Sequence, residues 1–125
     1  MNENEISKIL VDCCFKVHTK LGPGLLESVY EEVLSYEIIS RGLKIERQKG
    51  IPIIYNDIKM ELGFRADIIV ENKIIIELKS IEAIAPVHSK QLLTYLKLSG
   101  IKLGLLINFN EALIKDGIKR IVNNL

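Results

Sequence analysis

Hydrophobic positions at the start of the chain recur with the period of an α-helix. The first repeat is formed by Ile6, Ile9, Leu10, Cys13, Val17 and Leu21. It predicts an amphipathic helix over residues 5–20, which the Gly-Pro-Gly sequence at 22–24 brings to an end. A second helix is predicted from about residue 25 to residue 40, because Arg41-Gly42 is a helix-ending signal.

The middle of the chain changes to short β-rich segments. These lie at residues 43–48, 51–55, 58–62, 65–71 and 73–79. Asn56-Asp57 and Asn72-Lys73 have the composition of tight turns between strands. The segments therefore predict an antiparallel β-meander.

The last part of the chain predicts a helix, a buried strand and a further helix. Pro86 opens the first of these helices, which ends near Gly100, and residues 101–108 form the apolar strand. A final helix is predicted over residues 111–122. The order of elements predicts an α/β fold with a mixed central sheet, in which strand 101–108 joins in parallel through the crossover helix.

The most informative chemical pattern is Asp67 near the start of one apolar strand, with Glu77 and Lys79 on the next. Strand side chains alternate between faces, so Glu77 and Lys79 share one face. Charged groups within an isoleucine-rich strand need partners to offset the cost of burial. Asp67 would supply one partner and a divalent cation the rest, as in a magnesium-dependent phosphodiesterase site.

This interpretation makes a geometric prediction about the hairpin. Asp67 and Glu77 can share a metal only on the same face, as directly opposed residues do. Their pairing requires an odd-numbered loop centred on Asn72, whereas a two-residue loop would separate the acids. The alternative is that Asp67 caps a strand end while Glu77 and Lys79 form a salt bridge.

Two predicted helices carry further polar groups at helical spacing. Glu27, Tyr30 and Glu31 share one face, where an acid would act as a metal ligand or water-positioning base. The alternative is a solvated acidic first turn that complements the helix dipole.

His88, Gln91 and Tyr95 share a face of the third helix. Gln91 would bind a phosphate or hold the attacking water, and Tyr95 would orient Lys79 or stack on a base. The alternative is the ordinary polar face of a packed helix. His18 lies at the border of the first helix's apolar stripe and is expected to be a hydrogen-bonded helix-edge histidine.

Composition limits the class of protein. At 125 residues, with 48% hydrophobic and 26% charged residues, the chain is expected to form one domain, residues 1–125, with a substantial core. No apolar run has the length of a membrane span, and the acidic start lacks the features of a signal peptide, so a cytoplasmic protein is expected. The adjacent Cys13 and Cys14 are expected to be core thiols.

The distribution of charge along the chain adds weak support for a nucleic-acid partner. Residues 1–62 hold 8 basic and 10 acidic residues, and residues 63–125 hold 9 basic and 6 acidic residues. A basic bias in the half that carries Glu77 and Lys79 is compatible with a phosphate-bearing partner. Zinc-ligand spacing, a nucleophile elbow and a phosphate-binding P-loop are all missing from the sequence.

The segment Gly24-Leu-Leu-Glu27-Ser-Val-Tyr30 resembles the signature of the GxxExxY proteins, a prokaryotic group in the PD-(D/E)xK nuclease-like superfamily. The resemblance extends from Ile6 to about Ile107. It implies a restriction-endonuclease-like core, a mixed central β-sheet flanked by helices in the order αβββαβ, here with an extra N-terminal helix.

The resemblance also implies roles for the residues of the hairpin. Asp67 and Glu77 match the metal-binding acids, together with the backbone carbonyl of Leu78, and Lys79 matches the catalytic lysine. The implied cofactor is Mg²⁺, with Mn²⁺ as a substitute. Ala66 stands where the motif's name expects proline, a position that varies widely in such enzymes.

On the helices, Glu27 matches the acid of the first core helix, with Glu31 as the less favoured choice, and Gln91 matches a polar residue that follows the motif. Possible substrate contacts are Tyr30, Glu31, His88 and Tyr95. The implied function is a nuclease acting on nucleic acid, with DNA as the expected substrate. A homodimer is also expected, because a chain of 125 residues has little room for a separate specificity domain and a dimer would supply more substrate surface. The alternative is a binding module that does not cleave, or a subunit of a repair or defence complex.

Overall fold

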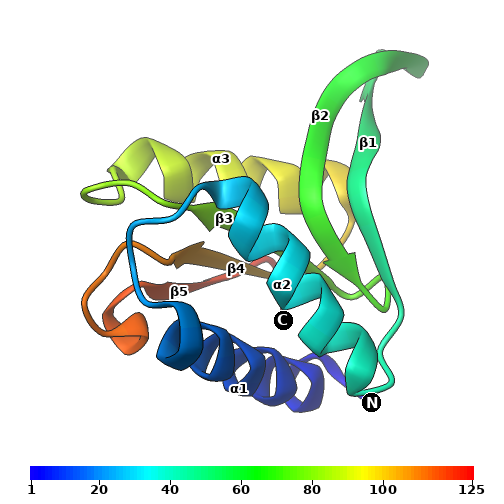
Figure 1. Cartoon of the computed structure of the whole chain (residues 1–125). Coiled ribbons are helices and arrows are strands. Elements are labelled where there is room, and N and C mark those ends of the chain that lie inside the picture. Colours follow the sequence, from blue (N-terminus) through cyan, green and yellow to red (C-terminus); the bar gives the residue numbers. More distant parts are fainter.

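A mixed five-stranded sheet lies between two helices on one face and one helix on the other (Figure 1). The computed structural model describes residues 1–125 except for the side chain of residue 62. The elements are α1 (Glu3–Leu21), α2 (Glu27–Ser40), β1 (Ile45–Tyr55), β2 (Ile58–Val70), β3 (Ile74–Lys79), α3 (Pro86–Ser99), β4 (Leu103–Asn108), the short 3₁₀ helix η1 (Ile114–Asp116) and β5 (Ile118–Val122).

The strands are arranged in sequence order, from β1 to β5. Strands β1, β2 and β3 form an antiparallel meander, and β4 pairs with β3 in parallel. This confirms the predicted meander and the crossover through α3. From α2 to β4 the order is αβββαβ, preceded by the extra helix α1.

Each face of the sheet has its own hydrophobic core. Helices α1 and α2 pack against one face, from which Ile68, Ile76 and Leu78 project. Helix α3 packs against the other face through Leu92 and Leu96. Alternate residues of β3 point into opposite cores. Glu77 and Lys79, near the end of the strand, are the residues of β3 that are partly exposed to solvent.

Local signals explain where the helices begin and end. The side chain of Asn2 accepts the N–H of Glu5 at 2.8 Å, and Glu5 accepts the N–H of Asn2 at 2.9 Å, which forms a capping box at the start of α1. Pro86 is the first residue of α3, and Gly100 ends that helix in the left-handed conformation, with φ of 76°.

The predicted final helix over 111–122 is wrong. The segment forms η1 and then β5, which pairs antiparallel with β4. Strand β5 satisfies the backbone groups of β4 that would otherwise form an open sheet edge. Gly117 allows the backbone before β5 to lie close to the end of β4, since a Cβ at this position would be 2.3 Å from the backbone oxygen of Asn108.

The four short segments predicted between residues 43 and 71 are two long strands. Strand β1 continues through Gly50 and Pro52, and an irregularity in its pairing with β2 lies between Ile51 and Ile53. Beyond the last β3 pair, β1 and β2 continue together as a two-stranded arm that projects from the rest of the sheet (Figure 1). We call residues 49–66 the β1–β2 arm.

The two cysteines and His18 of α1 are among the buried residues of this helix, and the burial of both cysteines was expected from the sequence. Cys13 and Cys14 are free thiols in the core, and burial raises the pKa of both. His18 is buried, with Nε2 2.8 Å from the carbonyl oxygen of Glu111. In the part of the chain that the structure describes, no helix is long and apolar enough to cross a membrane.

Candidate active site

The β2–β3 hairpin has the register that a shared metal site requires. Ile68 pairs with Ile76 and Val70 with Ile74, so the loop between the strands contains residues 71–73. Two of these loop residues have positive φ, 53° and 54°. The three-residue loop confirms the prediction of an odd number, and continuation of this register places Asp67 opposite Glu77.

At this position side chains replace the backbone ladder. The N–H of Leu78 donates to Asp67 Oδ2 at 2.8 Å, and the N–H of Asp67 donates to Glu77 Oε1 at 3.4 Å. The N–H and C=O of one strand residue point to the same side, so the Leu78 carbonyl faces the same gap. Two carboxylates and one carbonyl therefore meet where β2 separates from β3.

The electrostatics of this pair are unusual. Burial raises the pKa of Glu77 to about 8, and the nearby negative charge of Asp67 adds to the effect, while Lys79 opposes it. Burial and then the charges of Glu77 and Asp67 also raise the pKa of Tyr95. With a pKa of about 8, Glu77 mostly holds its proton at neutral pH in the metal-free protein, and the pair lies close to Tyr95 of α3.

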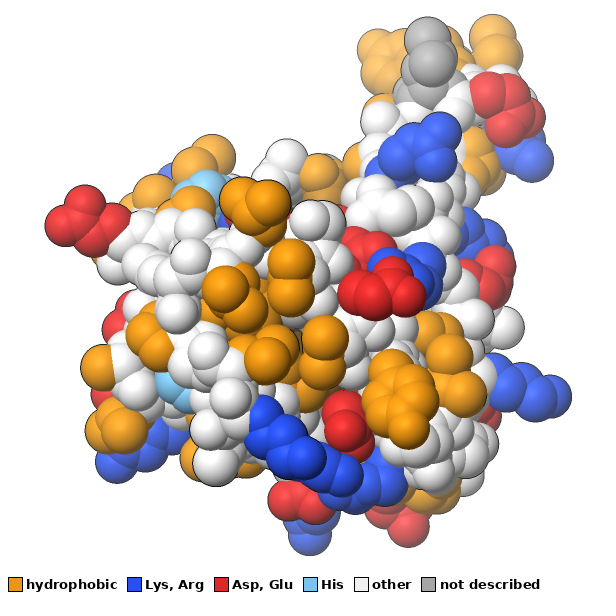
Figure 2. Space-filling view, in the orientation of Figure 1, with side chains coloured by type: hydrophobic (Ala, Val, Ile, Leu, Met, Phe, Trp, Pro, Cys, Tyr) orange, Lys and Arg blue, Asp and Glu red, His pale blue; other side chains and the backbone are white. Residues whose placement is uncertain are grey.

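Acids of α2 lie beside Asp67. A hollow of about 390 Å³ is lined by Glu27, Ser28, Glu31, Glu32, Arg47, Gln48, Asp67 and Leu78. Figure 2 shows acidic and basic side chains gathered at the base of the β1–β2 arm. The hollow brings α2, β1, β2 and β3 together around the end of the hairpin.

The two α2 acids occupy different positions in this hollow. Glu27 is exposed at the start of the helix. Glu31 is buried and accepts hydrogen bonds from Arg47 at 3.0 and 3.1 Å and from Gln48 at 2.6 Å. Glu31, which the sequence ranked second, is the acid connected to Asp67, because Gln48 also donates to Asp67 at 3.2 Å.

The donor atoms fit a small divalent cation. In the described part of the chain no three Asp, Glu, His or Cys residues cluster as a complete metal site. Mg²⁺, however, is commonly held by one or two carboxylates and keeps several waters. Asp67, Glu77 and the Leu78 carbonyl supply such oxygens. The pKa of Glu77 is raised by burial and then by the charge of Asp67, and a bound cation would favour its ionised form.

Comparison with known families agrees with this geometry. A model of the PD-(D/E)XK nuclease superfamily matches residues 4–121. The chain belongs to this superfamily. The mixed sheet flanked by helices is consistent with its restriction-endonuclease-like fold. Neither the curated proteins nor the solved structures gave a significant match.

In this superfamily member, Tyr30 lies in the hydrophobic core and does not line the hollow beside Asp67. Its side chain is fully buried and stacks on Phe109, with ring centroids 4.5 Å apart. Its hydroxyl donates to the carbonyl of Gly22 at 2.6 Å and accepts the N–H of Leu25 at 3.1 Å. Tyr30 therefore fixes the loop before Glu27 and has no exposed surface with which to contact a substrate.

Tyr30→Phe is expected to lower the free energy of unfolding by about 1–3 kcal/mol, because two backbone groups lose their partner while the ring remains packed. Urea denaturation measures the change. Tyr36→Phe is the matched control, since Tyr36 lies on the same helix with 71% of its surface exposed, and it should shift stability by less than about 0.5 kcal/mol. Equal stability of the two variants would contradict this role.

The α3 residues are placed as follows. Gln91 is exposed, and His88 Nδ1 accepts the N–H of Ala85 at 3.0 Å, which ties His88 to the start of its own helix. Tyr95 stacks on Phe64 of β2, with centroids 3.6 Å apart and planes 6° apart. Tyr95 therefore joins α3 to the base of the β1–β2 arm and lies near the carboxylate pair, whose charges contribute to its raised pKa.

Arg47 and Gln48 were not identified from the sequence. Arg47 pairs with both Glu31 and Glu32, at 3.0 and 2.9 Å. Gln48 has a left-handed backbone, with φ of 50°. Glutamine is not a residue that signals this conformation, and the contacts are with residues distant in sequence, so no local pattern could have revealed them.

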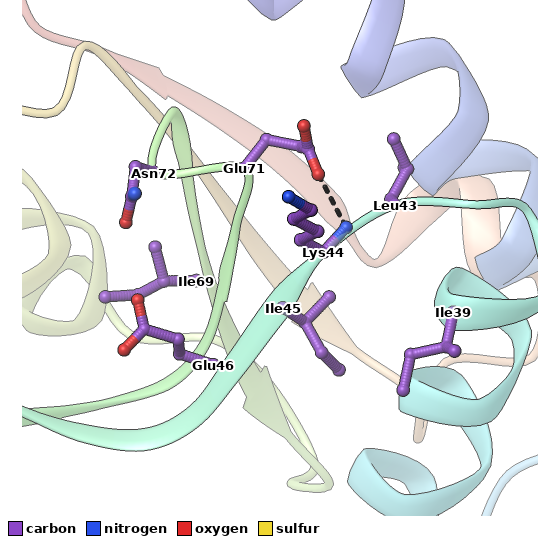
Figure 3. A pocket seen from close by; sticks show the side chains of 8 residues that line it. All are labelled: Ile39, Leu43, Lys44, Ile45, Glu46, Ile69, Glu71 and Asn72. Atoms are coloured by element: carbon purple, nitrogen blue, oxygen red, sulfur yellow. Dashed lines mark hydrogen bonds between the residues drawn. The ribbon is translucent and has the colours of Figure 1, made fainter.

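A larger hollow, of about 650 Å³, lies elsewhere along β1 and β2 (Figure 3). Its apolar lining comes from Ile39, Leu43, Ile45 and Ile69. Glu71 beside it accepts the N–H of Lys44 at 2.5 Å. Asp67 and Leu78 line the smaller hollow and not this one, so the larger volume does not mark the candidate site.

Proposed function

We propose that this chain is a metal-dependent nuclease that hydrolyses phosphodiester bonds of nucleic acid, with DNA as the expected substrate. The observation that carries the proposal is the register that sets Asp67 opposite Glu77 in a chain of the nuclease superfamily. Lys79 follows Glu77 by two residues, on the same face of β3.

Asp67, Glu77 and the Leu78 carbonyl would hold Mg²⁺, with Mn²⁺ as a substitute. The bound ion would polarise a phosphate oxygen and lower the pKa of a water molecule. Lys79 would donate hydrogen bonds to the negative charge that develops on the phosphate. The N–H of Leu78 holds Asp67 in one orientation, so this ligand needs little rearrangement.

The exposed helix residues would act around this centre. Glu27, at the start of α2, would orient the attacking water, and Gln91 on α3 would contact a substrate phosphate. Membership of the GxxExxY group is part of the proposal. Two of its signature positions support this part of the proposal. The Tyr30 hydroxyl binds the loop that contains Gly24, and Gly24 has a φ of 96°, which favours glycine.

A cleavage assay with Mg²⁺ and Mn²⁺ over single-stranded, duplex and branched DNA and RNA tests the proposal. Lys79→Ala is expected to reduce the rate about 10²–10⁴-fold, since a charge that stabilises the transition state is removed. Lys97→Ala, which removes an exposed lysine at the end of α3, should cut at the wild-type rate.

A folded protein that cuts none of these substrates would contradict the nuclease proposal. Salt-dependent nucleic-acid binding without turnover would instead support the binding module that does not cleave. Equal cutting by Lys79→Ala and wild type would remove Lys79 from the mechanism. Molecular mass measured over a range of concentrations would test the proposed homodimer.

A further inference from the structure

Gln48 occupies a special position in strand β1. Arg47 pairs with Ile68 and Lys49 with Ala66, so the same register places Gln48 opposite Asp67. Its φ of 50° is in the left-handed region, which side chains other than Asn, Asp and Gly rarely adopt. The pairing of β1 with β2 has the same register before and after Gln48, so a β-bulge does not account for the left-handed conformation.

The side chain of Gln48 joins two acids from different elements. Its Nε2 donates to Glu31 Oε1 at 2.6 Å and to Asp67 Oδ1 at 3.2 Å. A single amide nitrogen has two hydrogens, so both can be used in this way. The backbone is held from the opposite strand, because Arg65 Nη1 donates to the Gln48 carbonyl at 3.0 Å.

These contacts settle the orientation of the Asp67 carboxylate. Oδ2 accepts the N–H of Leu78 and Oδ1 accepts the Gln48 amide, so rotation of the group is restrained at both oxygens. Each oxygen retains a lone pair for another partner. The same amide also keeps the negative charge of Glu31 beside the site, with Arg47 bound to its other oxygen.

We propose that Gln48 is a positioning residue for the metal site: its amide orients Asp67 and holds Glu31 next to it, and its left-handed backbone directs the amide to both. The proposal deepens the proposed function and rests on it. Backbone strain at one residue costs stability, and it is found most often where the strained residue serves a site. Gln48 combines this strain with hydrogen bonds to the candidate ligand Asp67 and to the neighbouring acid Glu31.

Gln48→Gly separates a positioning role from a purely structural one. Glycine adopts positive φ without strain, so the variant removes the amide and relieves the backbone at once. We expect its urea midpoint to equal or exceed that of wild type, while its affinity for Mn²⁺ falls about 10–100-fold, the usual effect of losing a partner that orients a ligand. Calorimetric titration of the protein with Mn²⁺, without nucleic acid, measures the affinity.

Lys49→Gly is the matched control, because it places glycine at the next, exposed position of the same strand. It should lower the urea midpoint and leave the Mn²⁺ affinity unchanged. Gln48→Ala, which removes the amide and keeps a Cβ, should lower the Mn²⁺ affinity as the glycine variant does. It also provides the same test if the glycine variant does not fold.

The outcomes distinguish this proposal from the function on which it rests. Wild-type affinity for Mn²⁺ in Gln48→Gly or Gln48→Ala would overturn the role of Gln48 and leave the nuclease proposal intact. Equal loss of affinity in Lys49→Gly would also overturn it, since the effect would then belong to the strand. Failure of the wild-type chain to bind Mn²⁺ at all would overturn the metal-dependent function itself.

Discussion

Glu77→Gln is expected to lose cleavage and to gain stability at pH 8. The substitution removes a metal ligand, which should lower the rate about 10²–10⁴-fold. It also removes a carboxyl group whose pKa is raised to about 8 by burial and then by the charge of Asp67, so that its ionisation at pH 8 destabilises the folded state. The glutamine retains an oxygen that accepts the Asp67 N–H, so we expect the free energy of unfolding to rise by about 1–3 kcal/mol.

Cleavage rate and urea denaturation, both at pH 8, measure the two effects, with EDTA present in the denaturation. Glu82→Gln is the control, because Glu82 is an exposed acid shortly after the same strand. It should change neither quantity. A Glu77→Gln variant that cuts as fast as wild type would remove Glu77 from the mechanism, and one that is less stable would contradict the electrostatic account.

The stability of the metal-free protein is expected to fall as pH rises from about 5 to about 8. In this range the unfolded chain has released the proton of Glu77, whose ordinary pKa is 4.5, while the folded protein still holds it. The folded state binds more protons, so the free energy of unfolding decreases as pH rises. The contribution is complete below the unfolded pKa and is lost as pH passes through about 8.

Urea denaturation at pH 5, 6.5 and 8 in EDTA would measure this trend, and the difference between wild type and Glu77→Gln isolates the contribution of Glu77 from other titrating groups. Mg²⁺ should reduce the loss at pH 8, because the cation favours the ionised carboxylate and binds the folded state. Identical pH dependence in the two proteins would show that Glu77 does not titrate in this range.

Much of the fold could be predicted because strong local signals coincide with tertiary contacts. Pro86 and Gly100 mark the ends of α3 in both the sequence and the structure. The β2–β3 hairpin is the best example for the site. The need for Asp67 and Glu77 to share a face predicted an odd loop length, and the pairing of Ile68 with Ile76 has that register.

Other features depend on contacts that leave no local pattern. The segment around Ile118 was predicted as a helix, but it forms β5 because the edge of β4 needs a partner. Tyr30 matched a family signature, yet only its stacking on Phe109 shows that it is buried. The contact of Gln48 with Glu31 and Asp67 joins three elements and requires a backbone conformation that the sequence does not indicate.

The adjacent cysteines of α1 have a practical consequence. Only the thiolate reacts readily with disulfide reagents, and burial both raises the pKa of Cys13 and Cys14 and shields their sulfur atoms. In the folded protein both thiols should therefore not react with such reagents, and they become labelled only when α1 separates from the sheet. The rate of thiol labelling thus reports how often this helix opens, and no probe has to be introduced.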